Sequence, residues 1–167
     1  MGYSTLSIIP TDPHFAPSRE AIRRAVLLME KYFPYPRDHE IRVYESPHPR
    51  FFAEDSSCYQ FVCPACRKKT TYDEFNTAAG DEEAWYFFIE AAEGAPDATA
   101  YSIETPCCKK SLLLSELIFE DSAGKTAGIS RFRISLTGVE EALSEEERSE
   151  MEKALGCTVI QVITSGT

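Results

Sequence analysis

Alternating and helical patterns of apolar residues predict a strand, a helix and a second strand at the start of the chain. Apolar and polar residues alternate over 3–9, which is the period of a strand. Apolar residues recur at helical spacing over 18–33, where Ser18 can cap the helix and Pro34 ends it. Alternation returns over 40–46. This part of the chain is therefore predicted to form a β-α-β unit.

The C-terminal segment repeats this order of elements. Residues 129–136 alternate between apolar and polar side chains, as in a strand with one buried face. Ser144 and Glu147 form a capping box at the start of a helix, and Gly156 stands where that helix is expected to stop. A mostly apolar run over 158–164 predicts the last strand. A second β-α-β unit follows from this pattern.

Two β-α-β units predict the α+β class, with a ferredoxin-like sandwich in which both helices cover one face of an antiparallel sheet. The segment between the units has a different character, because it carries most of the cysteines. We therefore predict that 1–56 and 120–167 form the sandwich, and that 57–119 forms an inserted lobe.

The inserted segment is predicted to contain strands, two cysteine-bearing turns and a helix. An aromatic strand at 58–62 leads into one cysteine pair, and a strand at 101–105 leads into the other. Residues 112–119 leave the second pair as one or two further strands. Strands that alternate with cysteine turns are typical of a zinc ribbon, and a helix at 81–93 separates its two halves.

The two cysteine pairs carry the clearest chemistry in the sequence. Cys63 and Cys66 belong to a Cys-Pro-Ala-Cys motif, and Cys107 and Cys108 are adjacent. Two clustered thiol pairs suit a tetrahedral zinc site with four thiolate ligands, which has no open coordination position for chemistry. A redox-active dithiol is the rival interpretation, but it normally lies at a helix N-terminus and leaves the second pair unexplained. The spacing therefore favours structural zinc.

The adjacent cysteines are the weaker half of this site, because both thiolates must turn inward to share one metal. Either Cys107 or Cys108 can instead be a buried structural thiol. Cys58 is then the leading substitute ligand, followed by His48. Cys157 lies beyond a predicted helix stop and is expected to pack in the core.

A resemblance to a known family rests on three features of the second half. They are the Thr-Pro-Cys-Cys string at 105–108, the Leu-rich segment after it, and a closing strand, helix, Leu-Gly-Cys and strand. With these features the chain resembles a group of uncharacterised bacterial zinc-ribbon proteins, and the resemblance covers most of its length. It implies that zinc is bound by four residues, Cys63, Cys66, Cys107 and Cys108. No molecular activity comes with the family.

The chain departs from this family after each cysteine pair. The family often carries Gly there, whereas this chain carries Arg67 and Lys109. A residue other than Gly in a turn with positive φ costs about 1 kcal/mol. That cost is small beside the apparent binding free energy of structural zinc, about 10–16 kcal/mol. The absence of Gly therefore puts the geometry of the two turns in doubt more than it does metal binding.

Composition disfavours nucleic acid as a partner. The formal net charge is −10, with 27 acidic and 17 basic residues, and nucleic-acid binding usually depends on basic residues that neutralise phosphates. Basic residues do flank the cysteine pairs, namely Arg67, Lys68, Lys69, Lys109 and Lys110. Their simpler interpretation is that they offset the negative charge of a zinc–thiolate centre.

The sequence carries no recognisable signal for membrane insertion, secretion or catalysis. Neither a membrane span nor a secretory signal is visible, so a cytoplasmic location is expected. In a reducing compartment, paired cysteines indicate metal rather than disulfides. The His-Glu-x-x-His motif, the Walker loop and the zinc-deaminase pattern are all missing from the sequence, and no catalytic residue is predicted.

Three hypotheses for the function remain. The favoured one is a protein-interaction module of the adaptor or immunity type, with structural zinc and a protein partner. The second is an enzyme with a pocket between the lobe and the sandwich. The third is a nucleic-acid binder that uses the basic residues beside the cysteines, with Tyr59 or Tyr72 stacking on bases.

Overall fold

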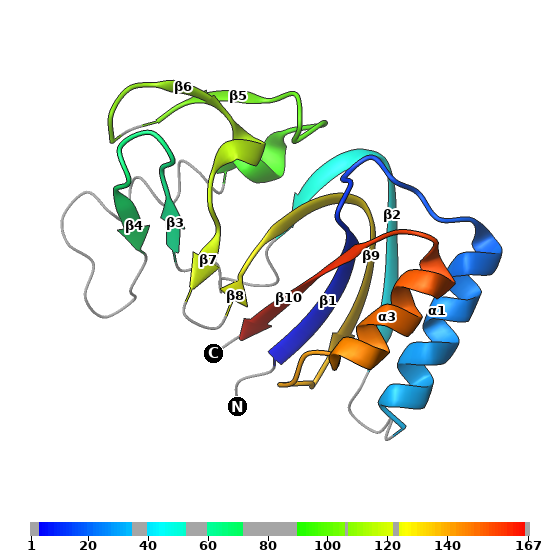
Figure 1. The fold of residues 1–167 in the computed structure, drawn as a ribbon. Coiled ribbons are helices and arrows are strands. Elements are labelled where there is room, and N and C mark those ends of the chain that lie inside the picture. Colours follow the sequence, from blue (N-terminus) through cyan, green and yellow to red (C-terminus); the bar gives the residue numbers. More distant parts are fainter. Residues whose placement is uncertain are drawn as a thin grey trace.

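The structure is a computed structural model that describes residues 4–34, 40–52, 60–71, 90–105, 107–121 and 124–165. Over these residues the chain has a mixed α/β fold with an antiparallel four-stranded sheet, two helices packed against it, a further helical turn at 90–94 and a set of short hairpins (Figure 1). The prediction that helices combine with an antiparallel sheet is confirmed.

The sheet is built from strands near the two ends of the chain. They are β1 (Ser4–Pro10), β2 (Ile41–Phe52), β9 (Gly128–Thr137) and β10 (Val159–Ser165). Their order is β10-β1-β9-β2, and every neighbouring pair is antiparallel. Because β1 lies between β9 and β10, the N-terminal β-α-β segment is interleaved with the C-terminal one.

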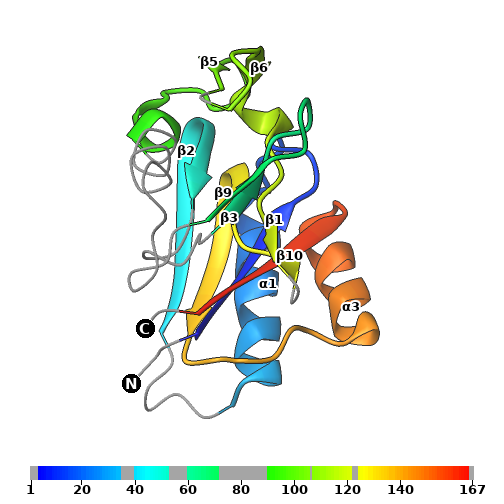
Figure 2. The same cartoon turned by 90° about the vertical axis from the view of Figure 1, so that its left-hand side faces the viewer.

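Two capped helices cover one face of this sheet (Figures 1 and 2). They are α1 (Arg19–Tyr32) and α3 (Glu145–Leu155). The Ser18 side chain accepts a hydrogen bond from the Ala21 N–H at 3.2 Å. Ser144 and Glu147 form the reciprocal capping box, and Gly156 ends α3 with a φ of 78°. The start and stop residues predicted for both helices are therefore confirmed.

The main hydrophobic core fills the space between the helices and the sheet. Phe132, Ile134 and Leu136 of β9 all belong to it, as the predicted alternation required. The same cluster contains Met29 of α1 and Met151 of α3, which are fully buried. Burial of this apolar surface is the main force that holds the helices on the sheet.

A polar contact adds to the packing of the two helices against each other. Tyr32 of α1 donates a hydrogen bond from its hydroxyl to the Glu150 carboxylate of α3 at 2.6 Å. This bond lowers the pKa of the Glu150 carboxyl. Within the described part of the chain, no helix is both long and apolar enough to cross a membrane.

The second strand is longer than the sequence predicted. β2 continues to Phe52, although it contains Pro47 and Pro49, which cannot donate backbone hydrogen bonds. The pairing of β2 with β9 shifts its register between Glu45 and Arg50, and β2 is an edge strand. Prolines are tolerated at edges and irregularities of this kind, so the strand resumes after them.

Short hairpins occupy the segment between β2 and β9, which contains the predicted lobe at 57–119. Their strands are β3 (Gln60–Val62) with β4 (Lys69–Thr71), β5 (Ser102–Glu104) with β6 (Ser111–Leu113), and β7 (Glu120–Asp121) with β8 (Gly124–Lys125). A 3-10 helix at Leu114–Glu116 follows β6, where only strands were predicted. Residues 90–94 are helical. The remainder of the predicted helix at 81–93 lies outside the described residues.

A second hydrophobic core lies in the lobe and reaches the sheet. It combines Phe61 of β3 with Phe51 of β2 and with Ala127, which precedes β9. Gly128 allows a close approach beside it, because a Cβ at this position would lie 2.7 Å from the Ile9 side chain. The lobe therefore packs directly on the sheet. The domain boundaries given above stay a prediction.

Candidate metal centre

The first cysteine pair lies in the loop between β3 and β4. The Cys63 N–H donates to the Lys68 carbonyl oxygen at 3.0 Å, and the Arg67 N–H donates to the Cys63 carbonyl oxygen at 2.9 Å. Arg67 has a φ of 64°, in the left-handed region. These bonds close a tight turn that holds both a buried thiol, Cys63, and an exposed one, Cys66.

The second pair lies in the loop between β5 and β6. The Thr105 N–H donates to the Lys110 carbonyl oxygen at 2.9 Å, and the Lys109 N–H donates to the Thr105 carbonyl oxygen at 2.9 Å. Lys109 has a φ of 60°. Each cysteine pair is thus followed by a residue other than Gly with a positive φ, so both turns adopt this conformation without the glycine.

The two loops meet at one end of the molecule and bring four thiols together (Figure 1). All Sγ atoms of this cluster lie within 4.8 Å of one another, and its members are Cys63, Cys66, Cys107 and Cys108. Between the loops, Sγ of Cys63 lies 3.9 Å from that of Cys108. Sγ of Cys66 lies 3.5 Å from that of Cys107. A tetrahedral site with Zn–S bonds of about 2.3 Å has S–S edges of about 3.8 Å. The cluster therefore has the size that a metal ion with four thiolates requires.

The two adjacent cysteines differ in how readily they ionise. A hydrogen bond from the Thr105 hydroxyl, helped by the Lys110 N–H, lowers the pKa of the Cys108 thiol to about 7. Burial, together with hydrogen bonds to neighbouring thiols, raises the pKa of Cys107 to about 12. A metal ion binds thiolates and displaces their protons, so metal binding would override this difference.

Of the two substitute ligands proposed from the sequence, only His48 is among the described residues. His48 lies exposed on β2 and is not among the grouped residues. Cys58 lies outside the described residues. Cys157 is half-buried and packs against the main core, as expected. Burial raises the pKa of its thiol to about 11.

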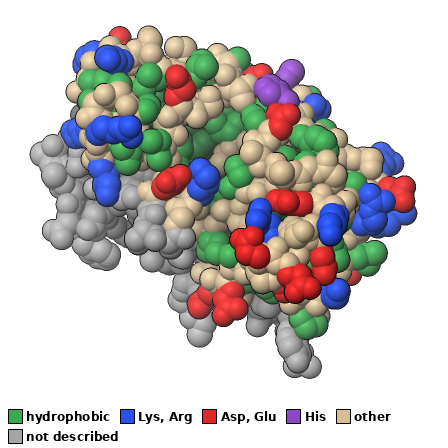
Figure 3. All heavy atoms as spheres, viewed as in Figure 1, with side chains coloured by type: hydrophobic (Ala, Val, Ile, Leu, Met, Phe, Trp, Pro, Cys, Tyr) green, Lys and Arg blue, Asp and Glu red, His purple; other side chains and the backbone are tan. Residues whose placement is uncertain are grey.

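Basic residues flank the cysteine pairs in both loops. All five predicted members of this group are exposed, namely Arg67, Lys68, Lys69, Lys109 and Lys110. None of them forms an ion pair with another described residue. Lys and Arg side chains gather where β5 and β6 lie, at the upper left of Figure 3. A zinc ion with four thiolates carries a net charge of about −2. The five basic residues therefore carry more positive charge than is needed to neutralise such a centre.

A groove lies between the lobe and the sheet, where the enzyme hypothesis places its pocket. It has a volume of about 390 Å³ and is lined by residues 114–120 and by Ile9 of β1, among others. Its charged lining residues include Glu120 and Lys125, which pair with each other at 3.1 Å. The described lining contains neither His nor Cys. The groove offers room for a small ligand.

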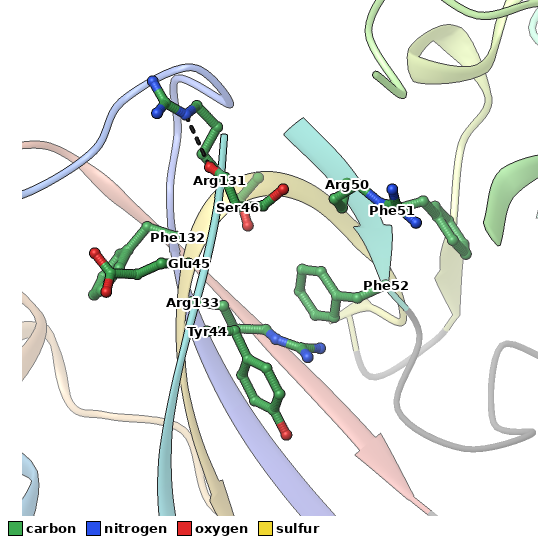
Figure 4. Close-up of a pocket in the computed structure, with 10 residues that line it drawn as sticks. Tyr44, Glu45, Ser46, Arg50, Phe51, Phe52, Arg131, Phe132 and Arg133 are labelled. Carbon is green, nitrogen blue, oxygen red and sulfur yellow. Dashed lines mark hydrogen bonds between the residues drawn. The ribbon is translucent and has the colours of Figure 1, made fainter. Parts of the chain in front are cut away.

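Sequence reasoning missed another groove, which opens where the pairing of β2 shifts (Figure 4). Its volume is about 220 Å³. The Arg133 guanidinium lies 4.0 Å from the Tyr44 ring and 4.3 Å from the Phe52 ring, so it is stacked against both. Arg131 donates from Nε to the Ser46 carbonyl oxygen at 3.1 Å. The polar positions of β9 were visible in the sequence, but Phe52 belongs to the part of β2 that was not predicted.

Comparisons with protein-family models, curated proteins and solved structures find no match for this chain. The resemblance to bacterial zinc-ribbon proteins therefore stays a prediction from the cysteine motifs. Function has to be inferred from the geometry of the cysteine cluster and from the charges around it.

Proposed function

We propose that this chain is a zinc-binding protein in which one structural ion is held by four residues, Cys63, Cys66, Cys107 and Cys108. A single observation carries the proposal: the four Sγ atoms lie within 4.8 Å of one another although they come from two separate hairpins. Hydrophobic burial does not explain this gathering, because Cys66 is exposed. A cation that binds thiolates does explain it.

Zinc fits this ligand set better than other common metals. Soft thiolate ligands select zinc, copper(I) and iron–sulfur clusters, and a tetrahedral set of four thiolates is typical of structural zinc sites. Such a site has no open coordination position, which favours a structural role over a catalytic one. The ion would tie the β3–β4 hairpin to the β5–β6 hairpin, which belong to different sheets.

For the fold we propose a ferredoxin-like sandwich with an inserted zinc-ribbon lobe, as in the proteins that the sequence resembles. The antiparallel strand order β10-β1-β9-β2 supports this assignment, since it combines two β-α-β segments with one helix each. The position of α1 and α3 on one face supports it as well. Two cysteine loops, each between paired strands, support the ribbon.

For the biological role we propose a cytoplasmic protein-interaction module whose partner is another protein. The closed four-thiolate site favours binding over catalysis. The net charge of −10 favours a partner with a complementary positive surface. Nucleic acid is the second candidate partner, because the exposed basic residues beside the cysteines have no ion pair with a described residue.

Metal analysis of the purified chain tests the zinc site. We expect about one zinc ion per chain, and a strong loss of zinc in Cys63→Ser, because a closed site needs all four thiolates. Cys157→Ser is the matched control, since Cys157 packs beside the main core and outside the cluster. Wild-type protein that folds normally without any metal would contradict the proposal. Bound iron in place of zinc would correct the identity of the ion.

Affinity purification from cells, with and without nuclease treatment, separates the two candidate partners. For the favoured role we expect a protein to be recovered in stoichiometric amount and to remain bound after nuclease treatment. Lys109→Glu reverses a charge beside the cysteine cluster, and Arg23→Glu makes the same change on α1 as a control. Recovery of nucleic acid that Lys109→Glu abolishes and Arg23→Glu keeps would instead establish the second candidate. Absence of any partner under varied conditions would reject both.

A further inference from the structure

The two cysteine loops share one backbone structure. In each loop the first residue donates its N–H to the carbonyl oxygen of the sixth residue, and the fifth residue donates its N–H to the carbonyl oxygen of the first. The fifth residue has a positive φ in both loops, 64° at Arg67 and 60° at Lys109. Each loop also joins two paired strands. The loops are therefore equivalent position by position.

This equivalence places Thr105 where the first loop has Cys63. Cys108 corresponds to Cys66 in the same way, so each loop provides a thiol from its fourth position. Cys107 has no such counterpart, because the equivalent residue in the first loop is Ala65. The second loop therefore carries a hydroxyl at its first position and takes an additional thiol from the middle of the turn.

Thr105 is in contact with the cluster despite its lack of a thiol. Its exposed fraction is 0%. Its Oγ1 atom accepts a hydrogen bond from the Lys110 N–H at 3.2 Å and lies 3.2 Å from Sγ of Cys108. A thiolate bound to a metal can only accept a hydrogen bond, so the hydroxyl must be the donor in the metal-bound protein. The Lys110 N–H, the hydroxyl and the sulfur then form one chain of hydrogen bonds.

We propose that Thr105 is a positioning residue of the metal centre, whose hydroxyl donates to the Cys108 thiolate from the loop position that a ligand occupies in the other hairpin. This inference rests on the proposed zinc site. The ion would take three thiolates from regular loop positions, those of Cys63, Cys66 and Cys108. It would take the fourth from Cys107, which reaches the cluster from the middle of its turn.

The hydroxyl has two physical effects on the site. It orients the Cys108 sulfur. It also donates a hydrogen bond to a lone pair of that sulfur that is not bound to the metal. Loss of such an outer hydrogen-bond partner typically lowers metal affinity about 10- to 100-fold. All four thiolates stay in place when the Thr105 hydroxyl is lost. Loss of the hydroxyl should therefore weaken metal binding without abolishing it.

A first experiment removes the hydroxyl and keeps the shape of the side chain. We expect Thr105→Val to lower zinc affinity by about 10- to 100-fold in competition with a chromophoric chelator. We expect Thr105→Ser to stay close to wild type, because it retains the hydroxyl. The Co²⁺-substituted proteins should differ in the energy of the thiolate-to-cobalt absorption, which a purely steric defect far from sulfur would not shift. Equal affinities and equal spectra for Thr105→Val and wild type would overturn the proposal.

A second experiment tests the equivalence of the loop positions directly. Cys107→Ala should leave three thiolates and weaken the thiolate-to-cobalt absorption. The double variant Thr105→Cys with Cys107→Ala places a thiol at the position that matches Cys63, so we expect it to restore the absorption of four thiolates. A double variant with the spectrum of Cys107→Ala alone would show that position 105 does not face the ion.

These results are distinguishable from failure of the zinc site itself. Wild-type protein without bound metal would reject the proposed function, whatever the variants do. Wild-type protein with full zinc, an unaffected Thr105→Val variant and no rescue by Thr105→Cys would leave the zinc site standing and reject only the role of Thr105. Circular dichroism of the sheet and helices serves as the folding control, because the main core lies outside the lobe.

Discussion

Removal of the metal by a chelator is expected to unfold the two cysteine hairpins while the four-stranded sheet and its helices stay folded. The main core between α1, α3 and the sheet contains no residue of the cysteine loops. The hairpins are formed by strands of three residues each, and such short pairs are not stable alone. Structural zinc contributes about 10–16 kcal/mol of apparent binding free energy. Without the ion, the two cysteine hairpins should therefore unfold.

Hydrogen exchange with and without chelator measures this effect. We expect the amides of 60–71 and 102–113 to lose their protection, and the amides of α1 and α3 to keep theirs. Restoring zinc should restore protection. Exchange that stays unchanged throughout the lobe after complete removal of metal would refute the structural role of the ion. Simultaneous loss of protection in α1 would show instead that lobe and sheet unfold as one unit.

Truncation of the central core residue of β9 is expected to have the largest effect of any single substitution in the sheet. Phe132 is 1% exposed and belongs to the cluster that joins the sheet to both helices. Phe132→Ala removes its ring and leaves a cavity, which costs about 3–5 kcal/mol. This is a large share of the total stability of about 5–15 kcal/mol of a typical domain. The variant should therefore be only marginally folded.

Urea denaturation followed by far-UV circular dichroism measures this loss as a lower transition midpoint. Leu27→Ala serves as the control, because Leu27 lies on α1 with 58% of its surface exposed. An exposed substitution of this kind should change stability by no more than about 0.5 kcal/mol. If Phe132→Ala were as stable as this control, the assignment of the main core would be wrong.

The regular elements of the sheet and its helices were largely predictable from the sequence. Periodicity located β1, β9 and α1, because side chains that face one core must recur at the period of the backbone. Ser144 and Gly156 marked the ends of α3, since capping depends on residues that are neighbours in sequence. These signals depend on residues close in the chain, so they can be recognised without knowledge of the tertiary structure.

The full length of β2 was not predictable from local signals. Pro47 and Pro49 normally end a strand, and only the edge position of β2 and its shifted register allow the strand to resume. The groove around Arg133 was missed for this reason, because Phe52 lies on the resumed part of the strand.

For the candidate site, the motifs identified the four cysteines but not how they face one another. That Cys63 lies next to Cys108, and Cys66 next to Cys107, depends on how the two hairpins meet. The contribution of Thr105 was not visible either, because the Thr-Pro-Cys-Cys string does not show what the threonine hydroxyl contacts. Only the backbone hydrogen bonds show that it stands at the position of a cysteine.

Local patterns in the sequence were enough to locate most strands of the sheet, both ends of its helices, and the thiols that are available to a metal. These properties depend on spacing and capping, which act between residues close in the chain. The tertiary structure alone decided that the β3–β4 and β5–β6 loops meet, and that the hydroxyl of Thr105 lies against the sulfur of Cys108. Contacts between residues far apart in the chain depend on the packing of whole hairpins, and no local pattern encodes that packing.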